Sequence, residues 1–267
     1  MKRLSTTQLL KRRAQGERLV MVTCYDATFA RLVERAGADM ILIGDSLGVV
    51  IQGHEHTIPV TLDEVIYHCR AVARGCAQPH LVGDLPFGSY QASHEEALRS
   101  AMRLMKEGGV QSVKLEGGER VVESVARITA AGVPVVGHLG LTPQSVHQLG
   151  GYGLQARTEA AAARLLADAV ALQEAGAFAL VLEGIPAPLA AQVTARLSIP
   201  TIGIGAGPEC GGQVLVLYDL LGLDERFTPK FLKKYDDLST RVTGAVSRYA
   251  AEVREGSFPG PEHTRQG

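Results

Sequence analysis

The chain has 267 residues, 46% of them hydrophobic, and it carries 27 basic against 28 acidic side chains. A chain of this size can build one large core, and its balanced charge excludes the strong basic field that nucleic-acid-binding proteins need. No apolar run reaches the roughly 20 residues of a membrane-spanning helix. The first 16 residues lack the apolar segment of a secretion signal. We therefore expect a globular protein without nucleic-acid or membrane partners.

The cysteines point to the same class of protein. None of the four has the CxxC spacing or the histidine partner of a zinc site. Three of them fall inside or beside apolar segments, so we expect reduced thiols in a cytoplasmic protein. The four are Cys24, Cys69, Cys76 and Cys210.

Eight short apolar runs alternate along the chain with longer segments of helical periodicity. The runs are apolar at consecutive positions, which is typical of parallel strands that are buried on both faces. The predicted strands are Leu19–Tyr25, Met40–Gly44, His80–Asp84, Ser112–Glu116, Val133–His138, Phe178–Glu183, Thr201–Gly205 and Val214–Tyr218.

Several of the intervening segments carry helix start and stop signals. Thr61 with Glu64, and Ser93 with Glu96, have the spacing of a capping box, and glycines follow many of the helical stretches. The predicted helices are Thr6–Ala14, Ala27–Ala36, the segments after Thr61 and Ser93, Glu119–Ala131, Thr158–Ala175, a stripe through Leu189, Val193 and Leu197, and finally Pro229–Tyr235 and Asp237–Glu255.

This alternation predicts an α/β fold, a (β/α)8 barrel that occupies residues 1–267 as one domain with a short N-terminal helix. One connection is irregular, because only Pro208–Gln213 separates the last two strands, less than the ten or so residues of a usual crossover helix. Either the seventh helix is reduced to a turn or the eighth strand lies elsewhere. An open, doubly wound sheet is the alternative fold.

Carboxylates stand at the ends of three neighbouring strands, where barrels of this type build their chemistry. Asp45, Asp84 and Glu116 follow the second, third and fourth strands. A single one would be as typical of a turn or a helix cap, but three converge on one rim. Carboxylates so close raise one another's pKa unless a cation lies among them. Because all-oxygen sites suit Mg²⁺, the sequence predicts an open magnesium site here.

Three more titratable residues end strands on the same rim. Lys114 lies two residues before Glu116 and so shares its face, where it can bind an anionic substrate, form a Schiff base or make an internal ion pair. Glu183 ends the sixth strand, across the barrel from Asp45, and is placed to act as a general base or to form an ion pair. His138 can hydrogen-bond a substrate carbonyl or be a satisfied rim histidine.

Two further motifs favour loop geometry over chemistry. The run Gly203-Ile-Gly205-Ala-Gly207 resembles a phosphate loop but has no basic side chain close behind it, so we expect a tight turn. The pair His54-Glu-His56 could suggest a metal site. It lies in the polar stretch 52–57, for which we expect a flexible flap.

Taken together, the motifs resemble the ketopantoate hydroxymethyltransferase family from about Thr23 to Glu262. The similarity is carried by Ile-Gly-Asp45-Ser46-Leu-Gly, Gly53-His-Glu-His-Thr57, Pro59-Val-Thr61, Gly83-Asp84-Leu-Pro-Phe-Gly88-Ser-Tyr, Val113-Lys-Leu-Glu-Gly117, Gly137-His-Leu-Gly-Leu-Thr-Pro143, Gly150-Gly-Tyr152, Leu182-Glu-Gly184, Gly203-Ile-Gly-Ala-Gly207 and Gly212-Gln-Val.

The resemblance implies a barrel of the phosphoenolpyruvate/pyruvate superfamily, assembled as a homodecamer in the cytoplasm. It also implies roles for individual residues. These are Mg²⁺ binding by Asp45, Asp84 and Glu116, substrate contacts from Asp45, Ser46, Asp84 and Lys114, with His138 as a further candidate, and proton acceptance by Glu183.

The implied reaction belongs to pantothenate biosynthesis. A hydroxymethyl group passes from 5,10-methylenetetrahydrofolate to 3-methyl-2-oxobutanoate, through a Mg²⁺-stabilised enolate, to give 2-dehydropantoate and tetrahydrofolate. Two alternatives remain open. One is a Mg²⁺-dependent lyase or aldolase acting on another 2-keto acid, and the other is a non-catalytic barrel that binds a phosphorylated ligand through Gly203–Gly207.

Overall fold

The computed structural model describes residues 3–224 and 229–265. These residues group into two compact units, Met1–Val216 and Leu217–Gly267, which are described separately below. The assignment of the whole chain to a single barrel domain stays a prediction.

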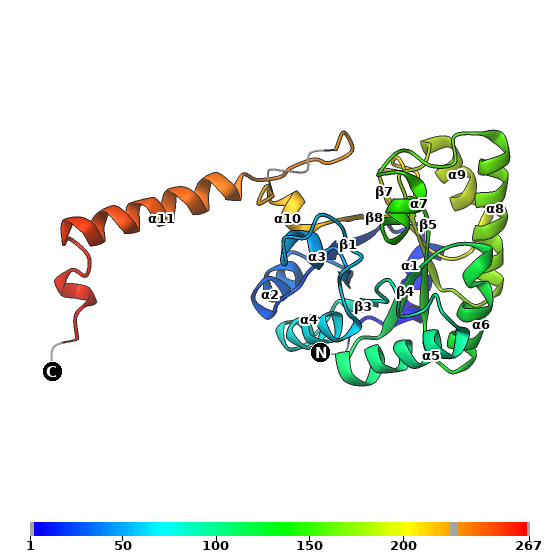
Figure 1. Cartoon of the computed structure of the whole chain (residues 1–267), viewed down its shortest axis with the longest axis horizontal. Helices are drawn as coiled ribbons and strands as arrows, with labels where there is room; N and C mark the ends of the chain where they lie inside the picture. Colours follow the sequence, from blue (N-terminus) through cyan, green and yellow to red (C-terminus); the bar gives the residue numbers. More distant parts are fainter. Residues whose placement is uncertain (1–2, 225–228, 266–267) are drawn as a thin grey trace. The chain divides into compact units, whose positions relative to one another are not determined.

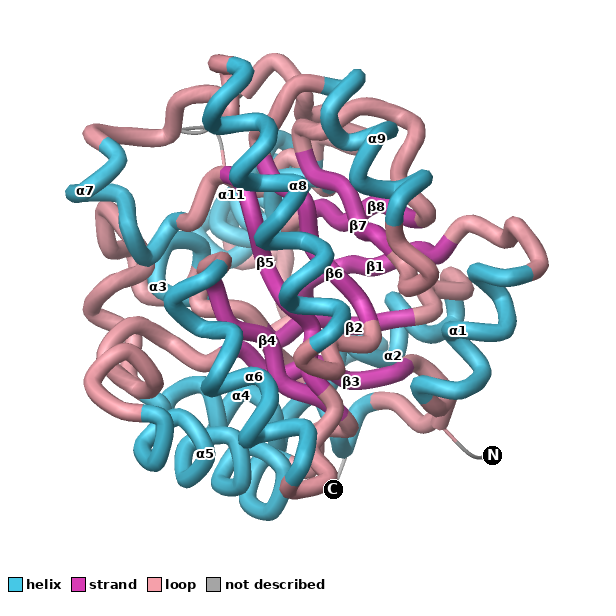
Figure 2. Tube along the Cα trace, turned by 90° about the vertical axis from the view of Figure 1, so that its right-hand side faces the viewer, coloured by secondary structure: helices cyan, strands magenta, loops and turns pink. Residues whose placement is uncertain are grey.

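The first unit is a closed barrel of eight parallel strands in chain order, with β8 paired to β1. The barrel prediction is therefore confirmed, and the open-sheet alternative is wrong. Figure 2 shows the ring of strands with helices outside it. The strands are β1 (Leu19–Thr23), β2 (Met40–Ile43), β3 (His80–Asp84), β4 (Ser112–Glu116), β5 (Val135–Gly140), β6 (Ala179–Glu183), β7 (Thr201–Ile204) and β8 (Gly212–Leu215).

Most of the predicted helices form between these strands (Figure 1). Thr61 and Glu64 form the predicted reciprocal cap, whereas at Ser93 only the hydrogen bond from the Glu96 N–H is present. The longer helices are α1 (Thr6–Ala14), α2 (Ala27–Arg35), α4 (Leu62–Gly75), α5 (His94–Arg103), α6 (Val122–Ala130), α8 (Glu159–Glu174) and α9 (Ala187–Arg196). Shorter helical segments are α3 (Leu47–Val50), η1 (Leu104–Gly108), η2 (Glu119–Val121), η3 (Pro143–Ser145) and α7 (Val146–Leu149).

The connection between β7 and β8 contains turns and no helix, as the short spacing required. The eighth strand begins at Gly212, two residues before the predicted start, and ends at Leu215, so the prediction was wrong from Val216 onward. A Cβ at Gly212 would lie 2.4 Å from the carbonyl oxygen of Leu19, so this strand starts on a glycine that packs directly against β1. Glycine has a low strand propensity, which hid the start of the strand.

The second unit contains α10 (Leu217–Leu220), α11 (Leu238–Glu255) and η4 (Pro261–His263). The predicted helix Asp237–Glu255 is present as α11, and Asp237 is its N-cap, which accepts the Thr240 N–H. The predicted helix Pro229–Tyr235 is wrong, because these residues form a turn and irregular chain. A seven-residue segment has little helix stability of its own without packing. Among the described residues, no helix has the length and apolar character to cross a membrane.

The core of the first unit fills the barrel below its carboxyl-terminal rim. Every residue of β2, β3 and β4 is buried, in agreement with the continuous apolar runs. Leu9 of α1 is fully buried and packs in one cluster with Leu19, Met40 and Phe178, near the amino-terminal ends of the strands. The apolar filling leaves polar side chains at the carboxyl-terminal rim.

Candidate active site

The strand register brings the predicted site residues to one end of the barrel. Lys114 lies beside Asp84 between β4 and β3, and Glu116 lies beside His138 between β4 and β5. Asp45 follows β2 after one glycine. These acidic residues are nearly inaccessible to solvent. Asp45 is only 5% exposed, and Asp84 and Glu116 are each 1% exposed. Water therefore does little to stabilise these charges.

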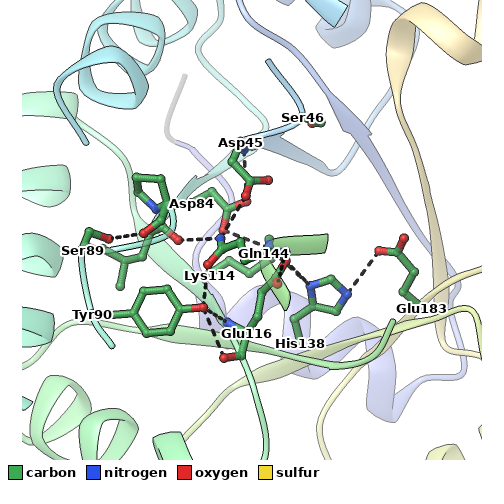
Figure 3. A network of polar contacts seen from close by, with 12 residues as sticks. Asp45, Ser46, Asp84, Ser89, Tyr90, Lys114, Glu116, His138, Gln144 and Glu183 are labelled. Carbon is green, nitrogen blue, oxygen red and sulfur yellow. Dashed lines mark hydrogen bonds and ion pairs between the residues drawn. The ribbon is translucent and has the colours of Figure 1, made fainter. Parts of the chain in front are cut away.

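One lysine and several N–H groups hold the three carboxylates together (Figure 3). The Lys114 ammonium lies 2.9 Å from Asp84 Oδ1 and 3.6 Å from Glu116 Oε1. Asp84 Oδ2 also accepts the main-chain N–H of Asp45, at 3.2 Å. The convergence predicted from the strand ends is thus present, and Lys114 faces the carboxylates as its spacing from Glu116 required.

The electrostatics of this cluster favour an added cation. Burial raises the pKa of Asp45 well above its usual range, and the charges of Asp84 and Glu116 raise it further. Burial also raises the pKa of Asp84, although Lys114 opposes the change. At Glu116 burial raises the pKa, but Lys114 and His138 outweigh it and the net direction is down. Asp45 and Asp84 are therefore the carboxylates whose negative charge the protein stabilises least.

His138 connects the cluster to Glu183. Its Nδ1 lies 3.2 Å from Glu116 Oε1, and its Nε2 lies 3.2 Å from Glu183 Oε2. Burial and the Lys114 charge lower the pKa of His138, but the hydrogen bonds to Glu116 and Glu183 outweigh them and raise it to about 9. His138 is then an imidazolium whose positive charge lies between the two carboxylates. The ion-pair alternative for Glu183 is present, with a side chain that remains 18% exposed.

The other predicted residues lie on nearby loops. Ser46 follows Asp45 and precedes α3, and its Oγ lies 2.8 Å from the hydroxyl of Tyr25. The stretch 52–57 has no helix or strand, and the ring of His56 packs edge-on against that of His147, with 5.0 Å between centroids. That this stretch is a flexible flap stays a prediction. Gly205 and Gly207 have positive φ, as in a tight turn.

Two further buried residues, which the strand-end argument did not find, complete the cluster. Gln144 donates its side-chain N–H to Asp45 and its main-chain N–H to Glu116. Tyr90 donates to Gln144 Oε1 at 2.7 Å. Tyr90 lies within a quoted motif and Gln144 directly follows another. An uncharged side chain on a loop, however, carries no strand-end signal.

The donor set fits a hard divalent cation such as Mg²⁺. Within residues 3–224 and 229–265, no three His, Cys, Asp or Glu side chains are arranged to hold a metal ion by themselves. Mg²⁺ needs fewer, because it is usually bound by one or two carboxylates with water and substrate oxygens in its other positions. Asp45 and Asp84 provide buried oxygens with excess charge. The role of Glu116 as a third metal ligand stays a prediction.

The chain is similar over nearly its whole length to known proteins. The family model described as ketopantoate hydroxymethyltransferase matches residues 3–261. The 3-methyl-2-oxobutanoate hydroxymethyltransferase of Syntrophotalea carbinolica is 54% identical over 263 residues, which cover 98% of each chain.

Solved structures at low identity agree with the fold. The 2,3-dimethylmalate lyase of the phosphoenolpyruvate mutase/isocitrate lyase superfamily has a TM-score of 0.59 at 18% identity, over 98% of this chain and 92% of that one. Phosphonopyruvate hydrolase in complex with oxalate and Mg²⁺ has a TM-score of 0.59 at 16% identity, over 97% and 93%. The fold is thus shared with these solved structures, and the match of family model and sequence identity shows that the chain belongs to the ketopantoate hydroxymethyltransferase family.

Proposed function

We propose that this chain transfers a hydroxymethyl group from 5,10-methylenetetrahydrofolate to 3-methyl-2-oxobutanoate, as a Mg²⁺-dependent step of pantothenate biosynthesis. The observation that carries the proposal is the buried cluster of carboxylates with Lys114 and His138 at the carboxyl-terminal rim. The name of the similar enzyme from Syntrophotalea carbinolica supports the choice of substrate.

The cluster offers separate places for the cation and the keto acid. Asp45 and Asp84 would hold Mg²⁺, with Glu116 as the third predicted ligand. When bound, Mg²⁺ would supply the positive charge that stabilises negative charge on the keto oxygen of the substrate. The Lys114 ammonium, 2.9 Å from Asp84, would bind the substrate carboxylate beside the cation, and Ser46 Oγ would donate a hydrogen bond to it. Phosphonopyruvate hydrolase, which shares the fold, was solved in complex with oxalate and Mg²⁺, and oxalate, like a 2-keto acid, carries oxygens on adjacent carbons.

We propose that Glu183 moves the proton. It ends β6, opposite β2 in the ring of strands, and its carboxylate is held by His138 while remaining partly exposed. We assign it the removal of the proton from C3 of 3-methyl-2-oxobutanoate. His138 keeps the carboxylate oriented towards the substrate, and its charge stabilises the negative charge nearby.

The remaining steps of the reaction consume one water molecule. The enolate carbon forms a bond to the methylene carbon of the folate, and that carbon's bonds to nitrogen break. Water supplies the hydroxyl group, so the products are 2-dehydropantoate and tetrahydrofolate. We also propose that the chain works in the cytoplasm as a homodecamer, an assembly implied by the family resemblance and testable by native mass measurement.

One assay tests the reaction. The purified protein is incubated with 3-methyl-2-oxobutanoate, formaldehyde and tetrahydrofolate, with Mg²⁺ or with EDTA. We expect 2-dehydropantoate with Mg²⁺, and its loss with EDTA and recovery when Mg²⁺ is restored. Cleavage of another 2-keto acid without 2-dehydropantoate would favour a lyase, and activity that is unchanged in EDTA would contradict the metal assignment.

A further inference from the structure

Gln144 occupies the centre of the carboxylate cluster although it is uncharged. It lies in η3, directly after β5, and is 3% exposed. Its side-chain nitrogen lies 2.9 Å from Asp45 Oδ2 and 2.9 Å from the carbonyl oxygen of Leu85. Its main-chain N–H donates to Glu116 Oε2 at 3.1 Å. One residue therefore contacts two carboxylates that come from different strands (Figure 3).

The contacts of the amide leave it only one orientation. Both hydrogens of Nε2 are used by acceptors, while Oε1 accepts from the Tyr90 hydroxyl at 2.7 Å and from Gln91 Nε2 at 3.2 Å. The Tyr90 hydroxyl accepts the main-chain N–H of Glu116 at 3.2 Å, and its own hydrogen is directed to Gln144 Oε1. A reversed amide would place its oxygen against the Asp45 carboxylate and the Leu85 carbonyl, with no donor between them.

This arrangement determines which carboxylate oxygens remain available to bind a cation. Gln144 occupies Asp45 Oδ2, whereas no described residue donates a hydrogen bond to Asp45 Oδ1. The main-chain N–H of Gln144 occupies Glu116 Oε2, and the other oxygen of Glu116 faces Lys114 and His138. Residues that hydrogen-bond metal ligands in this way typically change metal affinity or activity by about 10–100-fold when they are replaced.

We propose that Gln144 is a positioning residue of the metal site, which orients Asp45 through its side chain and Glu116 through its main chain without touching the substrate. The inference rests on the proposed function, because it assigns a divalent cation to these carboxylates. It adds a residue that is not among the predicted ligands. It also explains why a buried amide, and not an apolar side chain, lies at this position.

The test compares matched glutamine variants. Gln144→Met keeps the length of the side chain and removes its hydrogen bonds, and Gln144→Asn keeps an amide that is too short to reach Asp45. Gln148→Met is the control, because Gln148 is exposed and makes no hydrogen bond to the described residues. The metal dissociation constant is measured with Mn²⁺ by electron paramagnetic resonance, together with kcat and KM, and unfolding is followed without metal.

We expect Gln144→Met and Gln144→Asn to weaken Mn²⁺ binding about 10–100-fold, with activity partly restored by excess metal, and Gln148→Met to match the wild type. A folded variant with lower activity but unchanged Mn²⁺ affinity would overturn the inference. If Gln144→Met does not fold, Gln144→Asn decides by the same criterion. If neither variant folds, Gln144 serves folding and the positioning role is rejected.

A failure of the proposed function can be distinguished from a failure of the inference about Gln144. Wild-type protein that binds Mn²⁺ but does not exchange hydrogen at C3 of 3-methyl-2-oxobutanoate would refute the reaction. The comparison of metal affinities among the glutamine variants would still decide the role of Gln144.

Discussion

His80 provides a quantitative test of the burial at the base of the barrel, at the opposite strand ends from the carboxylates. It begins β3 and is fully buried. Its Nδ1 lies 2.9 Å from the carbonyl oxygen of Leu4, and its Nε2 lies 2.9 Å from Ser112 Oγ. A neutral ring that donates from Nδ1 and accepts at Nε2 satisfies both contacts. Burial lowers the pKa of His80 from 6.5 to about 4.

The size and sign of the effect follow from this change in pKa. Each pKa unit corresponds to about 1.4 kcal/mol, so the neutral ring contributes about 3 kcal/mol to the free energy of unfolding. Because the folded pKa is lower than the unfolded one, the contribution is complete above about pH 6.5. It is lost as the pH falls towards 4, and about 2 kcal/mol of it is gone at about pH 5.

The perturbation is His80→Gln, which keeps one donor and one acceptor but does not titrate. Urea unfolding is measured for both proteins in steps from about pH 7.5 to about pH 4.5. Carboxylates that titrate in both proteins cancel in the difference. We expect the free energy of unfolding of the wild type, relative to the variant, to fall by about 2 kcal/mol between about pH 7 and about pH 5.

A difference that stays constant over this range would refute the reasoning, because the ring would then be titrating alike in the folded and unfolded chains. NMR titration of the His80 ring is an independent check. If the His80 ring of the folded protein titrated with a midpoint near pH 6.5, burial would not disfavour its charged form, and the reasoning would be refuted whatever the stability data show.

Three further predictions concern the rim. Glu183→Gln should slow hydrogen exchange at C3 of 3-methyl-2-oxobutanoate by about 10²–10⁴-fold with unchanged Mn²⁺ affinity; retained exchange would assign the base to another residue. Asp45→Asn should abolish Mg²⁺-dependent activity yet stabilise the metal-free protein by about 1–3 kcal/mol in urea unfolding with EDTA, because it removes a poorly solvated charge. A variant with wild-type activity would remove Asp45 from the metal site. Gly140→Ala places a Cβ 2.1 Å from the carbonyl oxygen of Glu183, whereas Gly132→Ala, also at positive φ, meets nothing within 4 Å. Both should lose about 1 kcal/mol of stability through backbone strain, but Gly140→Ala should lose more stability because of the clash and should lose activity as well. Equal stabilities and activities would contradict the contact.

The sequence predicted the barrel because parallel strands buried on both faces leave a local signal. The bounds of β3 and β4 agree with the predicted runs, and α1 agrees with its predicted range. Asp84 and Glu116 are the last residues of their strands, so their place on the rim follows from the strand assignment and the common direction of the strands. Local pattern was enough to predict which acids meet.

Other features depend on contacts between distant residues. The start of β8 at Gly212 depends on close packing against Leu19. Residues 229–235 stay irregular because so short a segment forms a helix only where packing supports it. Neither has a local signal that distinguishes it from the alternative.

The sequence by itself determined the fold and the acids, since strand burial and strand order place Asp45, Asp84 and Glu116 at one rim. Only the tertiary structure decided how those acids are held. Gln144 is 99 residues from Asp45 in the chain, and the hydrogen bond between them exists because the loop after β5 folds over the end of β2. The same holds for the imidazolium of His138 between Glu116 and Glu183. Hydrogen-bond partners and the pKa of a buried group depend on distances across the barrel, and no spacing along the chain encodes them.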